Sequence, residues 1–327
     1  MKLSYEQIKN ITHGAVAVSA ENGVYSFDRF STEQLGIYEE KYRVYYERAQ
    51  ATASVIFEFD TDSKHFSFCY SIEKVRDEGV TGFDVFLNGE SYAEVRHSPE
   101  GVKDAQLSLR LPEGSNRVTL FFPSHYKMTV RDVSIDEGAA LLPVRRGKRI
   151  LFLGDSITQG FLSFEPSVTL PNLLLRKHPV EVLNQGIGSM HMFSPCIDAG
   201  TDFNPDIVII PLGTNDWNSD PTVEKCMNDC RAYLERAREL YPKATRVYVS
   251  PLWRSDRDTD TKCCSFDECK AGFMRIAKEY GCLTIDGEML IPHDAELLAD
   301  VAHPKTEGFF HYAERLDAAL RELGIEL

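Results

Sequence analysis

The sequence is poor in positive charge and contains no long apolar run. Its 327 residues include 36 Lys and Arg against 50 Asp and Glu, which gives a formal net charge of -14 at pH 7. Because binding to phosphates needs clustered basic side chains, this balance argues against nucleic acid or a membrane as a partner. One basic cluster is present, and we expect it to lie on a solvated linker; it comprises Arg145, Arg146, Lys148 and Arg149.

Signals for export are also missing. Residues Met1 to Gln7 lack the apolar core of a secretory signal, and no later stretch is long and apolar enough to cross a bilayer. The eight cysteines fit reduced thiols in a chain of this size. These features predict a soluble cytoplasmic protein.

Metal and nucleotide motifs are absent as well. The sequence has no His-Glu-x-x-His, no phosphate-binding Gly-x-x-x-x-Gly-Lys and no paired Cys-x-x-Cys spacing, so neither a metal nor a cofactor is expected. Cys226 and Cys230 fall on one face of an expected helix, where burial explains them. Cys263, Cys264 and Cys269 form a cysteine cluster that lacks partner ligands for a metal.

The first half of the chain consists of short β-type runs separated by turn signals such as Asn22-Gly23 and Asn88-Gly89. No long amphipathic helix is expected between residues 14 and 135. Many short strands at this spacing predict an all-β sandwich over residues 1–145, ending where Pro143 and Gly147 interrupt the pattern. The expected strands are 15–18, 24–27, 55–59, 66–70, 83–87, 92–95, 107–111, 118–122 and 128–135.

The second half, residues 146–327, alternates strands with helices. Expected strands cover residues 150–153, 180–183, 207–211, 247–250 and 283–285, and residues 222–240 have the clearest helical periodicity. This alternation predicts a parallel sheet with helices on both faces. In such sheets ligands bind in the loops after the strands, so the functional residues are expected there.

Four polar patches lie where these loops are expected. They are Gly154-Asp155-Ser156-Ile157-Thr158-Gln159-Gly160, Asn184-Gln185-Gly186-Ile187-Gly188, Gly213-Thr214-Asn215-Asp216 and Asp300-Val301-Ala302-His303. Taken singly, each patch is explained by turn or capping chemistry. Independent turns have no reason to reproduce the whole set in one order, so we treat the four as one site.

In this order and on this strand pattern, the patches resemble the blocks of the SGNH or GDSL hydrolase superfamily. The resemblance covers residues 149–327 and implies a flavodoxin-like parallel five-stranded sheet flanked by helices. It also implies that Ser156 is the nucleophile, with Asp300 and His303 completing a catalytic triad. The oxyanion hole would combine the backbone N–H groups of Ser156 and Gly186 with the side-chain amide of Asn215.

The chemistry of these residue types fits ester cleavage. Serine needs an adjacent base to take its proton during attack on an ester carbonyl, and a histidine can do so at neutral pH. Asp300, three residues before His303, can fix the tautomer of the ring and stabilise the imidazolium. The α/β-hydrolases share the order Ser, Asp, His, but they place the serine in Gly-x-Ser-x-Gly, which this chain lacks.

Two features favour a sugar ester as the substrate. Trp217 and Trp253 follow the third and fourth strands, where both are expected at the rim of the site and suit stacking on a pyranose; Asp155 and His191 are further candidates for substrate binding. A sandwich before the hydrolase domain also resembles the carbohydrate esterases of family 2. Residues 83–90 resemble a hairpin of jelly-roll, galactose-binding-like modules, so the sandwich either binds carbohydrate or only shapes the cleft.

Carbohydrate O-deacetylation is therefore the predicted activity, with a small-molecule or oligosaccharide ester as substrate. One alternative is an esterase, lipase, thioesterase or acyltransferase acting on a non-carbohydrate acyl ester. The charged loop with Arg254, Asp256, Arg257, Asp258 and Asp260 argues against a lipase entrance. A second alternative is a carbohydrate-binding protein with a vestigial hydrolase domain. The sequence leaves open whether the chain forms a homo-oligomer.

Overall fold

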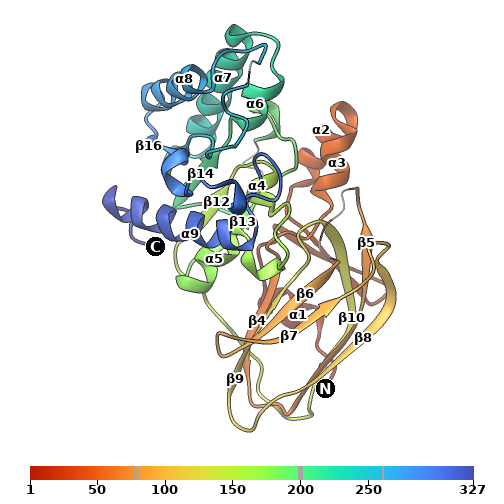
Figure 1. The fold of residues 1–327 in the computed structure, drawn as a ribbon. Coiled ribbons are helices and arrows are strands. Elements are labelled where there is room, and N and C mark those ends of the chain that lie inside the picture. Colours follow the sequence, from red (N-terminus) through yellow and green to blue (C-terminus); the bar gives the residue numbers. More distant parts are fainter. Residues whose placement is uncertain (77–78, 80, 198–201, 260) are drawn as a thin grey trace.

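The computed structural model describes residues 1–327 except 77–78, 80, 198–201 and 260, and the described part forms two lobes (Figure 1). The lower lobe in Figure 1 is a sandwich of two antiparallel sheets. One sheet has the order β1 (Thr12–His13), β4 (Ile56–Thr61), β9 (Asn116–Phe121), β6 (Gly82–Leu87) and β7 (Glu90–Arg96), with β11 (Leu142–Pro143) beside β4. The other has the order β2 (Ala17–Glu21), β3 (Val24–Asp28), β10 (Tyr126–Ile135), β5 (His65–Lys74) and β8 (Val102–Arg110).

Alternating side chains create the sandwich core. In β5, Phe66, Phe68, Tyr70 and Ile72 are buried, while the residues between them are more exposed. These buried side chains pack against the inner face of the other sheet, which includes Phe57 and Phe59 of β4. This two-residue period is what a half-buried strand requires, and it confirms the expected β-sandwich. A jelly-roll topology remains a prediction.

The first half is not all-β, although an all-β sandwich was predicted for residues 1–145. It contains α1 (Tyr5–Ile11), α2 (Thr32–Lys41) and α3 (Arg43–Ala49). The first two helices begin with capping boxes, in which Ser4 pairs with Gln7 and Ser31 pairs with Gln34. A serine followed three residues later by glutamine was therefore the available signal for both helices. It was missed because α2 has only a weakly amphipathic pattern.

The upper lobe is built on a five-stranded parallel sheet. Its strand order is β13 (Glu181–Asn184), β12 (Arg149–Phe152), β14 (Ile207–Pro211), β15 (Thr245–Val249) and β16 (Leu283–Ile285), the flavodoxin-like order 2-1-3-4-5. The flanking helices are α4 (Ser156–Gln159), α5 (Leu170–Lys177), α6 (Thr214–Ser219), α7 (Val223–Leu240), α8 (Phe266–Glu279) and α9 (Thr306–Glu322). Short 3-10 turns cover Pro166–Val168, Ser194–Cys196, Gly287–Leu290 and Ala295–Leu297. The expected parallel sheet is confirmed, and the helix expected over 222–240 is α7.

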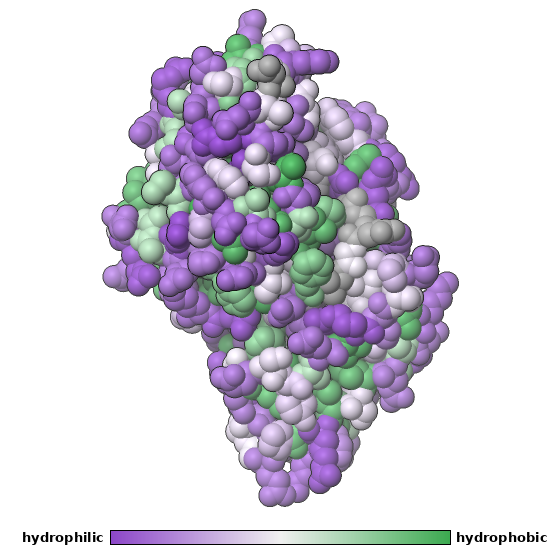
Figure 2. Space-filling model, viewed as in Figure 1, coloured by the Kyte–Doolittle hydropathy of each residue, from purple (hydrophilic) through white to green (hydrophobic). Residues whose placement is uncertain are grey.

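Two apolar cores cover the two faces of the parallel sheet. One contains residues of α5 and α9, and the other contains residues of α7 and α8. The second core also includes Phe30, Tyr38 and Tyr45 from the first half of the chain, so α2 and α3 pack against the parallel-sheet lobe. Hydrophilic residues cover much of the face seen in Figure 2. Among the described helices, none has the length and apolar character needed to cross a membrane.

Candidate active site

Ser156 follows the carboxyl end of β12, the strand between β13 and β14, and is the first residue of the short helix α4. The preceding Asp155 caps this helix, because its Oδ1 accepts a hydrogen bond of 2.9 Å from the N–H of Ile157. The helix ends after one turn at Gly160, whose φ of 100° lies in the left-handed region that favours glycine. This tight turn leaves the Ser156 side chain half-buried at the edge of the sheet.

His303 lies within hydrogen-bond distance of Ser156, although the two residues are 147 positions apart. The Nε2 atom of His303 is 2.7 Å from the Ser156 Oγ, and its Nδ1 atom is 2.7 Å from the Oδ2 of Asp300. The structure therefore brings together the three residues expected to form the triad. The arrangement can pass a proton from the hydroxyl to the imidazole while the carboxylate holds the ring.

Backbone donors fix the carboxylate of Asp300. Its Oδ1 accepts hydrogen bonds of 2.8 Å from the N–H groups of Ala302 and His303, which leaves Oδ2 for the imidazole. Partial burial raises the pKa of Asp300, but these N–H donors and the His303 ring outweigh it and hold the pKa below its ordinary value. Asp300 is thus a stable anion beside His303, as an orienting carboxylate must be.

Gly186 does not offer the N–H expected for an oxyanion hole. Its N–H donates a 2.8 Å hydrogen bond to the Oδ1 of Asn184, and its carbonyl oxygen accepts one from Arg29. A Cβ at this position would lie 2.5 Å from the backbone nitrogen of Gln159, so glycine is required for close packing against α4. The expected role of Gly186 is contradicted by this occupied N–H.

Ser189 presents a free donor in the same loop. From Gln185 to Met190, every backbone N–H except that of Ser189 donates to an acceptor within the described protein. Ser189 is exposed and has a φ of 62°, an uncommon value for a residue with a side chain. The sequence analysis missed this residue because a serine that follows a glycine carries no signal of a strained backbone.

Asn215 lies beside this part of the loop. Its side-chain Nδ2 donates a 3.0 Å hydrogen bond to the carbonyl oxygen of Met190, the residue that follows Ser189. An amide group has two N–H donors, so this bond fixes the orientation of Asn215 and leaves a second donor. Asn215 is the second residue of α6. This helix starts directly after Gly213, which has a φ of 121°.

Two of the expected substrate-binding residues are buried instead. The Asp155 side chain caps α4 inside the protein, where burial raises its pKa to about 6. Trp217 is 1% exposed, with its Nε1 donating a 3.0 Å hydrogen bond to the carbonyl oxygen of Cys264 and its ring edge-on to Phe266. Both predictions of a substrate contact are wrong. Asp155 is buried because it caps the first turn of α4, and Trp217 is buried because it lies on the face of α6 that packs into the core.

Trp253 and His191 remain partly exposed. The Trp253 ring stacks on the His293 imidazole, with 5.3 Å between the ring centres. The loop that carries Trp253 lies beside the loop that carries Asp300, because the N–H of Ser255 donates to the carbonyl oxygen of Val301. The Nδ1 of His191 is 3.8 Å from the Oδ1 of Asp216. In the charged loop, Arg254 is buried against Asp256, and Asp260 lies outside the described residues.

The amino-terminal half reaches the site at two places. The Phe161 ring lies edge-on between the imidazoles of His303 and His125, at 4.9 and 5.4 Å between ring centres. The buried Arg29 donates from its Nη1 to the carbonyl oxygens of Asn184 and Gly186. Local sequence patterns predict neither contact, because Arg29 lies 155 and 157 positions before its two acceptors and His125 lies 36 positions before Phe161, on the other side of the expected domain boundary.

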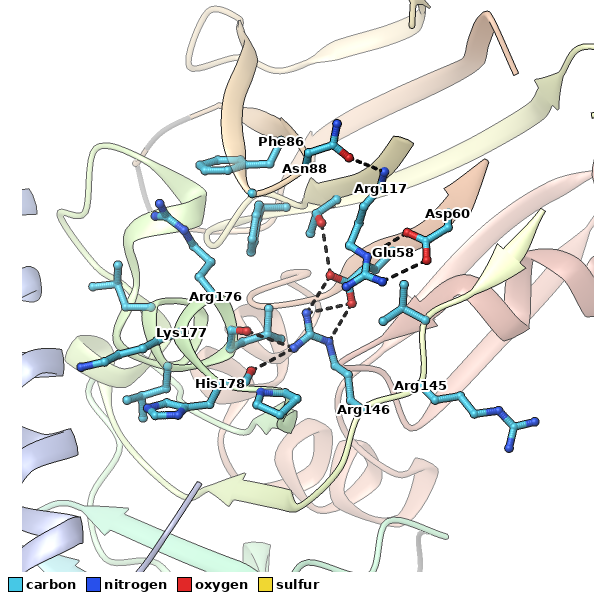
Figure 3. A pocket seen from close by; sticks show the side chains of 18 of the residues that line it. Glu58, Asp60, Phe86, Asn88, Arg117, Arg145, Arg146, Arg176, Lys177 and His178 are labelled. Carbon is cyan, nitrogen blue, oxygen red and sulfur yellow. Dashed lines mark hydrogen bonds and ion pairs between the residues drawn. The ribbon is translucent and has the colours of Figure 1, made fainter. Parts of the chain in front are cut away.

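A cavity of about 1170 Å³ is lined by residues of both lobes, and Figure 3 shows the side chains in its wall. Its lining includes Arg117 of the sandwich and Arg176 at the end of α5, but not Ser156, Asp300 or His303. In its wall Arg146 forms a two-pronged ion pair with Glu58, with both N–O distances at 2.8 Å. Arg146 was expected on a solvated linker; its side chain is instead buried by this pair, whereas Arg145 is exposed.

Two groups of described residues have the spacing to hold a metal ion. One consists of Cys226, Cys263 and Cys269, and the other of His191, Asp216 and Asp220. Neither group contains a member of the Ser156, His303 and Asp300 set. The ester chemistry described above therefore uses side chains and backbone donors that are separate from both groups.

Known proteins resemble this chain in sequence over one region and in fold over most of its length. Residues 152–309 match the GDSL-like lipase/acylhydrolase family. No curated protein sequence matches the chain significantly. A salicylyl-acyltransferase from a tetracycline biosynthetic pathway has a TM-score of 0.82 at 20% identity, covering 96% of this chain and 94% of its own.

Two carbohydrate esterases have the same fold. A family two carbohydrate esterase from Clostridium thermocellum has a TM-score of 0.60 at 17% identity, covering 84% of this chain and 94% of its own. An acetyl xylan esterase from the rumen bacterium Butyrivibrio proteoclasticus has a TM-score of 0.55 at 15% identity, with 83% and 90% covered. At these identities the similarity establishes a shared fold.

Proposed function

We propose that the chain is a serine esterase that removes short acyl groups, above all acetyl, from carbohydrates, and the match of residues 152–309 to the GDSL-like lipase/acylhydrolase family supports this proposal. One observation carries the proposal: the continuous hydrogen-bonded line from Asp300 through His303 to Ser156, with 2.7 Å at each step. Two distant parts of the chain, one with Ser156 and the other with Asp300 and His303, meet in the geometry that activates a serine hydroxyl.

The reaction proceeds in two halves. The Ser156 Oγ attacks the ester carbonyl carbon while its proton moves to the Nε2 of His303, which then gives that proton to the departing sugar hydroxyl. The acyl group remains on Ser156 as an ester. A water molecule then attacks this ester, gives a proton to His303 and releases the acid, after which the proton returns to Ser156. No metal or cofactor takes part.

Three donors are proposed for the oxyanion of the tetrahedral intermediate. They are the backbone N–H of Ser156 at the start of α4, the backbone N–H of Ser189 and the remaining N–H of the Asn215 side chain. Ser189 replaces Gly186 in this proposal, because the Gly186 N–H is occupied and the Ser189 N–H is not. Asn215 bonds the peptide next to Ser189, which supports a shared position for the two donors.

A sugar ester is favoured over a long-chain lipid. The loop that carries Trp253 also carries the exposed Asp258 and the partly exposed Asp256 and Arg257, a polar surround that does not suit an acyl chain of many carbons. The partly exposed Trp253 ring suits contact with a sugar face. The names of two structural neighbours, a family two carbohydrate esterase and an acetyl xylan esterase, point in the same direction.

Acyl transfer is the second candidate. A salicylyl-acyltransferase shares the fold over 96% of this chain, and the same acyl-serine can be attacked by an alcohol instead of water. The two activities differ only in which hydroxyl reaches the acyl-enzyme. They are separated by the product, which is a free acid for an esterase and a new ester for a transferase.

Acetate release from acetylated manno- and xylo-oligosaccharides tests the proposal. The same enzyme is assayed on p-nitrophenyl esters of increasing acyl length, with mass spectrometry to detect acyl groups moved to an added sugar. Ser156→Ala is the control, and its folding is checked by circular dichroism. We expect rapid acetate release, little activity on long acyl chains and no turnover by Ser156→Ala.

Other outcomes lead to other conclusions. Preference for long acyl esters, with the sugars untouched, would refute the deacetylase and leave only the serine chemistry. A new sugar ester formed in place of acid would establish the transferase. Ester cleavage that persists in folded Ser156→Ala would refute the serine mechanism itself. Binding of the sugars without any cleavage by the wild-type chain would favour a vestigial, carbohydrate-binding domain.

A further inference from the structure

Four of the eight cysteines meet at one end of the parallel-sheet lobe. Cys226 lies in the first turn of α7, Cys269 lies in the first turn of α8, and Cys263 and Cys264 lie just before α8. Helices α7 and α8 run side by side in Figure 1. Three chain segments therefore converge on one point, each bringing at least one thiol.

The sulfur atoms are close but not bonded. The Sγ atoms of Cys226 and Cys269 are 3.6 Å apart, and those of Cys263 and Cys264 are 3.8 Å apart. The thiols of Cys226, Cys263 and Cys269 all lie within 4.8 Å of one another, and the Cys264 thiol interacts with that of Cys269. All eight cysteines are free thiols in the structure.

The two shortest of these separations, 3.6 Å for Cys226–Cys269 and 3.8 Å for Cys263–Cys264, are those of a tetrahedral thiolate site. Zinc binds thiolate sulfur at about 2.3 Å, and a regular tetrahedron with that radius places its sulfur atoms about 3.8 Å apart. Ordinary core packing of cysteines explains burial, but it gives no reason for three thiols to lie within 4.8 Å of one another with a fourth, Cys264, 3.8 Å from one of them. Thiolate ligands also select soft cations such as zinc over magnesium or calcium.

Burial, and for Cys269 first the neighbouring Cys226 thiol, raises the pKa values of Cys263, Cys264 and Cys269, so these thiols would lose their protons only on binding a metal; two helix termini offset part of that cost. Cys226 and Cys269 are each the fourth residue of a helix whose first turn is capped, by Thr222 in α7 and by Ser265 in α8. Helix amino termini carry a partial positive charge that stabilises nearby anions. Two of the four sulfur atoms therefore lie where the backbone offsets part of the negative charge of the cluster.

We propose that Cys226, Cys263, Cys264 and Cys269 hold a structural zinc ion that joins α7, α8 and the loop between β15 and α8. The sequence analysis saw the cluster of three but no further ligand, because Cys226 is 37 positions before the nearest of them. The fold supplies that ligand. The ion is separate from the ester chemistry, and its role is to fix the segments that it joins.

One of these segments is connected to the candidate active site. The Nε1 of Trp217 donates to the carbonyl oxygen of Cys264, and Trp217 lies on α6 two residues after Asn215. A zinc ion that fixes Cys264 also fixes the acceptor of this indole. Loss of the ion is therefore expected to loosen α6 and, through it, the position of Asn215.

Metal analysis of the full chain tests the proposal. The protein is purified without affinity tags or chelators, and bound zinc is measured by plasma mass spectrometry; about one ion per chain is expected from a four-thiolate site. Cys226→Ala should lose the zinc. Cys230→Ala is the matched control, since Cys230 is equally buried one turn further along α7 and lies outside the group of close thiols.

Cobalt substitution reports the ligands directly. Replacement of the metal by Co²⁺ should give the intense visible bands of a tetrahedral ion and the near-ultraviolet charge-transfer bands of cobalt bound to thiolates. The half-exposed Cys263→Ala and Cys264→Ala variants repeat the test in case Cys226→Ala fails to fold. A zinc chelator should lower the melting temperature of the wild type and of Cys230→Ala.

Three results would overturn the proposal. The first is a wild-type chain that neither carries zinc nor takes up Zn²⁺ or Co²⁺ after reduction. The second is full zinc retention by folded Cys263→Ala or Cys226→Ala, which would place the ion elsewhere, for example at His191, Asp216 and Asp220. The third is a Cys226–Cys269 disulfide in protein purified under reducing conditions, identified by peptide mass spectrometry.

Discussion

Tyr45 donates its hydroxyl hydrogen to the carbonyl oxygen of Ser189 across 3.0 Å. The tyrosine belongs to α3, in the amino-terminal half, and the serine belongs to the loop after β13. Burial raises the pKa of Tyr45 to about 12, so the hydroxyl keeps its proton and remains a donor at neutral pH. The exposed turn at Ser189 is thus held by a side chain from the other half of the chain.

Tyr45→Phe removes this bond and keeps the ring in place. Because the bond holds the Ser189 turn, we expect kcat on a short acyl ester to fall by about tenfold, equivalent to about 1.4 kcal/mol, with a smaller change in KM. Tyr42→Phe is a suitable control, since Tyr42 is an exposed neighbour on the same helical segment. Equal kinetics for Tyr45→Phe and the wild type would show that the bond does not position the loop.

Asn215→Ala removes a proposed oxyanion donor. Loss of one such donor typically lowers turnover by about 10²–10³, so we expect that loss in kcat with KM little changed. Asn215→Asp keeps the shape but replaces the donor by an acceptor, and it should be at least as impaired. Steady-state kinetics on p-nitrophenyl acetate measure both variants. A rise in KM with kcat unchanged would assign Asn215 to substrate binding instead.

Arg29→Met tests the buried guanidinium below the same loop. Arg29 donates to the carbonyl oxygens of Ala51, Asn184 and Gly186, and its side chain is fully buried. Burial lowers its pKa to about 9, which still leaves it charged at neutral pH. Methionine leaves these carbonyls unpaired, so a loss on the order of 3 kcal/mol in unfolding free energy is expected. Urea denaturation measures it, and an unchanged midpoint would refute the role.

Glu58→Gln tests the buried ion pair in the wall of the cavity. The change leaves the Arg146 guanidinium without its carboxylate, and removal of one partner of a buried pair costs about 3–5 kcal/mol in stability. Asp60→Asn is the control, because Asp60 pairs with Arg117 nearby but both side chains are more exposed. We expect thermal denaturation to show a large loss for Glu58→Gln and a small one for Asp60→Asn.

Asp216 should make the protein less stable as the pH rises. Burial raises its pKa from 3.8 to about 7, so between these values the folded chain holds a proton that the unfolded chain has lost. The free energy of unfolding therefore falls across this window, by up to about 4 kcal/mol at 1.36 kcal/mol for each pKa unit. Asp216→Asn keeps the acceptor for the Met192 N–H and removes the titration.

The measurement is the melting temperature of Asp216→Asn and the wild type at several pH values from 4 to 8. The variant should be the more stable of the two at pH 8, and the difference should shrink toward pH 4. Asp220→Asn serves as a neighbouring control, because a lysine already pairs with Asp220. A constant difference across the range would show that Asp216 is ionised in the folded chain throughout.

The sequence predicted those parts of the structure that depend on local patterns. Two-residue and 3.6-residue periods located the strands and α7, and the four polar patches located the loops that contain Ser156, Asn215 and His303. Contacts between distant segments were beyond such patterns. The occupied N–H of Gly186 depends on Asn184 turning back onto its own loop, and the burial of Trp217 depends on which face of α6 meets α8.

The same limit applies to the cysteines and to the amino-terminal helices. Spacing alone connects Cys263, Cys264 and Cys269, whereas Cys226 joins them only because the first turns of two helices lie together. The capping boxes at Ser4 and Ser31 were readable in the sequence. What no capping signal reveals is that α2 and α3 pack on the opposite lobe, with Tyr38 and Tyr45 in its core.

The position of Phe161 between His125 and His303 bears on how such a chain can evolve. Of the two imidazoles that contact the Phe161 ring, that of His125 belongs to the sandwich half and that of His303 belongs to a loop of the hydrolase half. A recombination event near residue 145 would replace the sandwich and with it His125, which contacts the Phe161 ring beside His303. The two halves are therefore expected to be inherited as a single unit, and a gene fragment that begins at residue 146 should not encode a working enzyme.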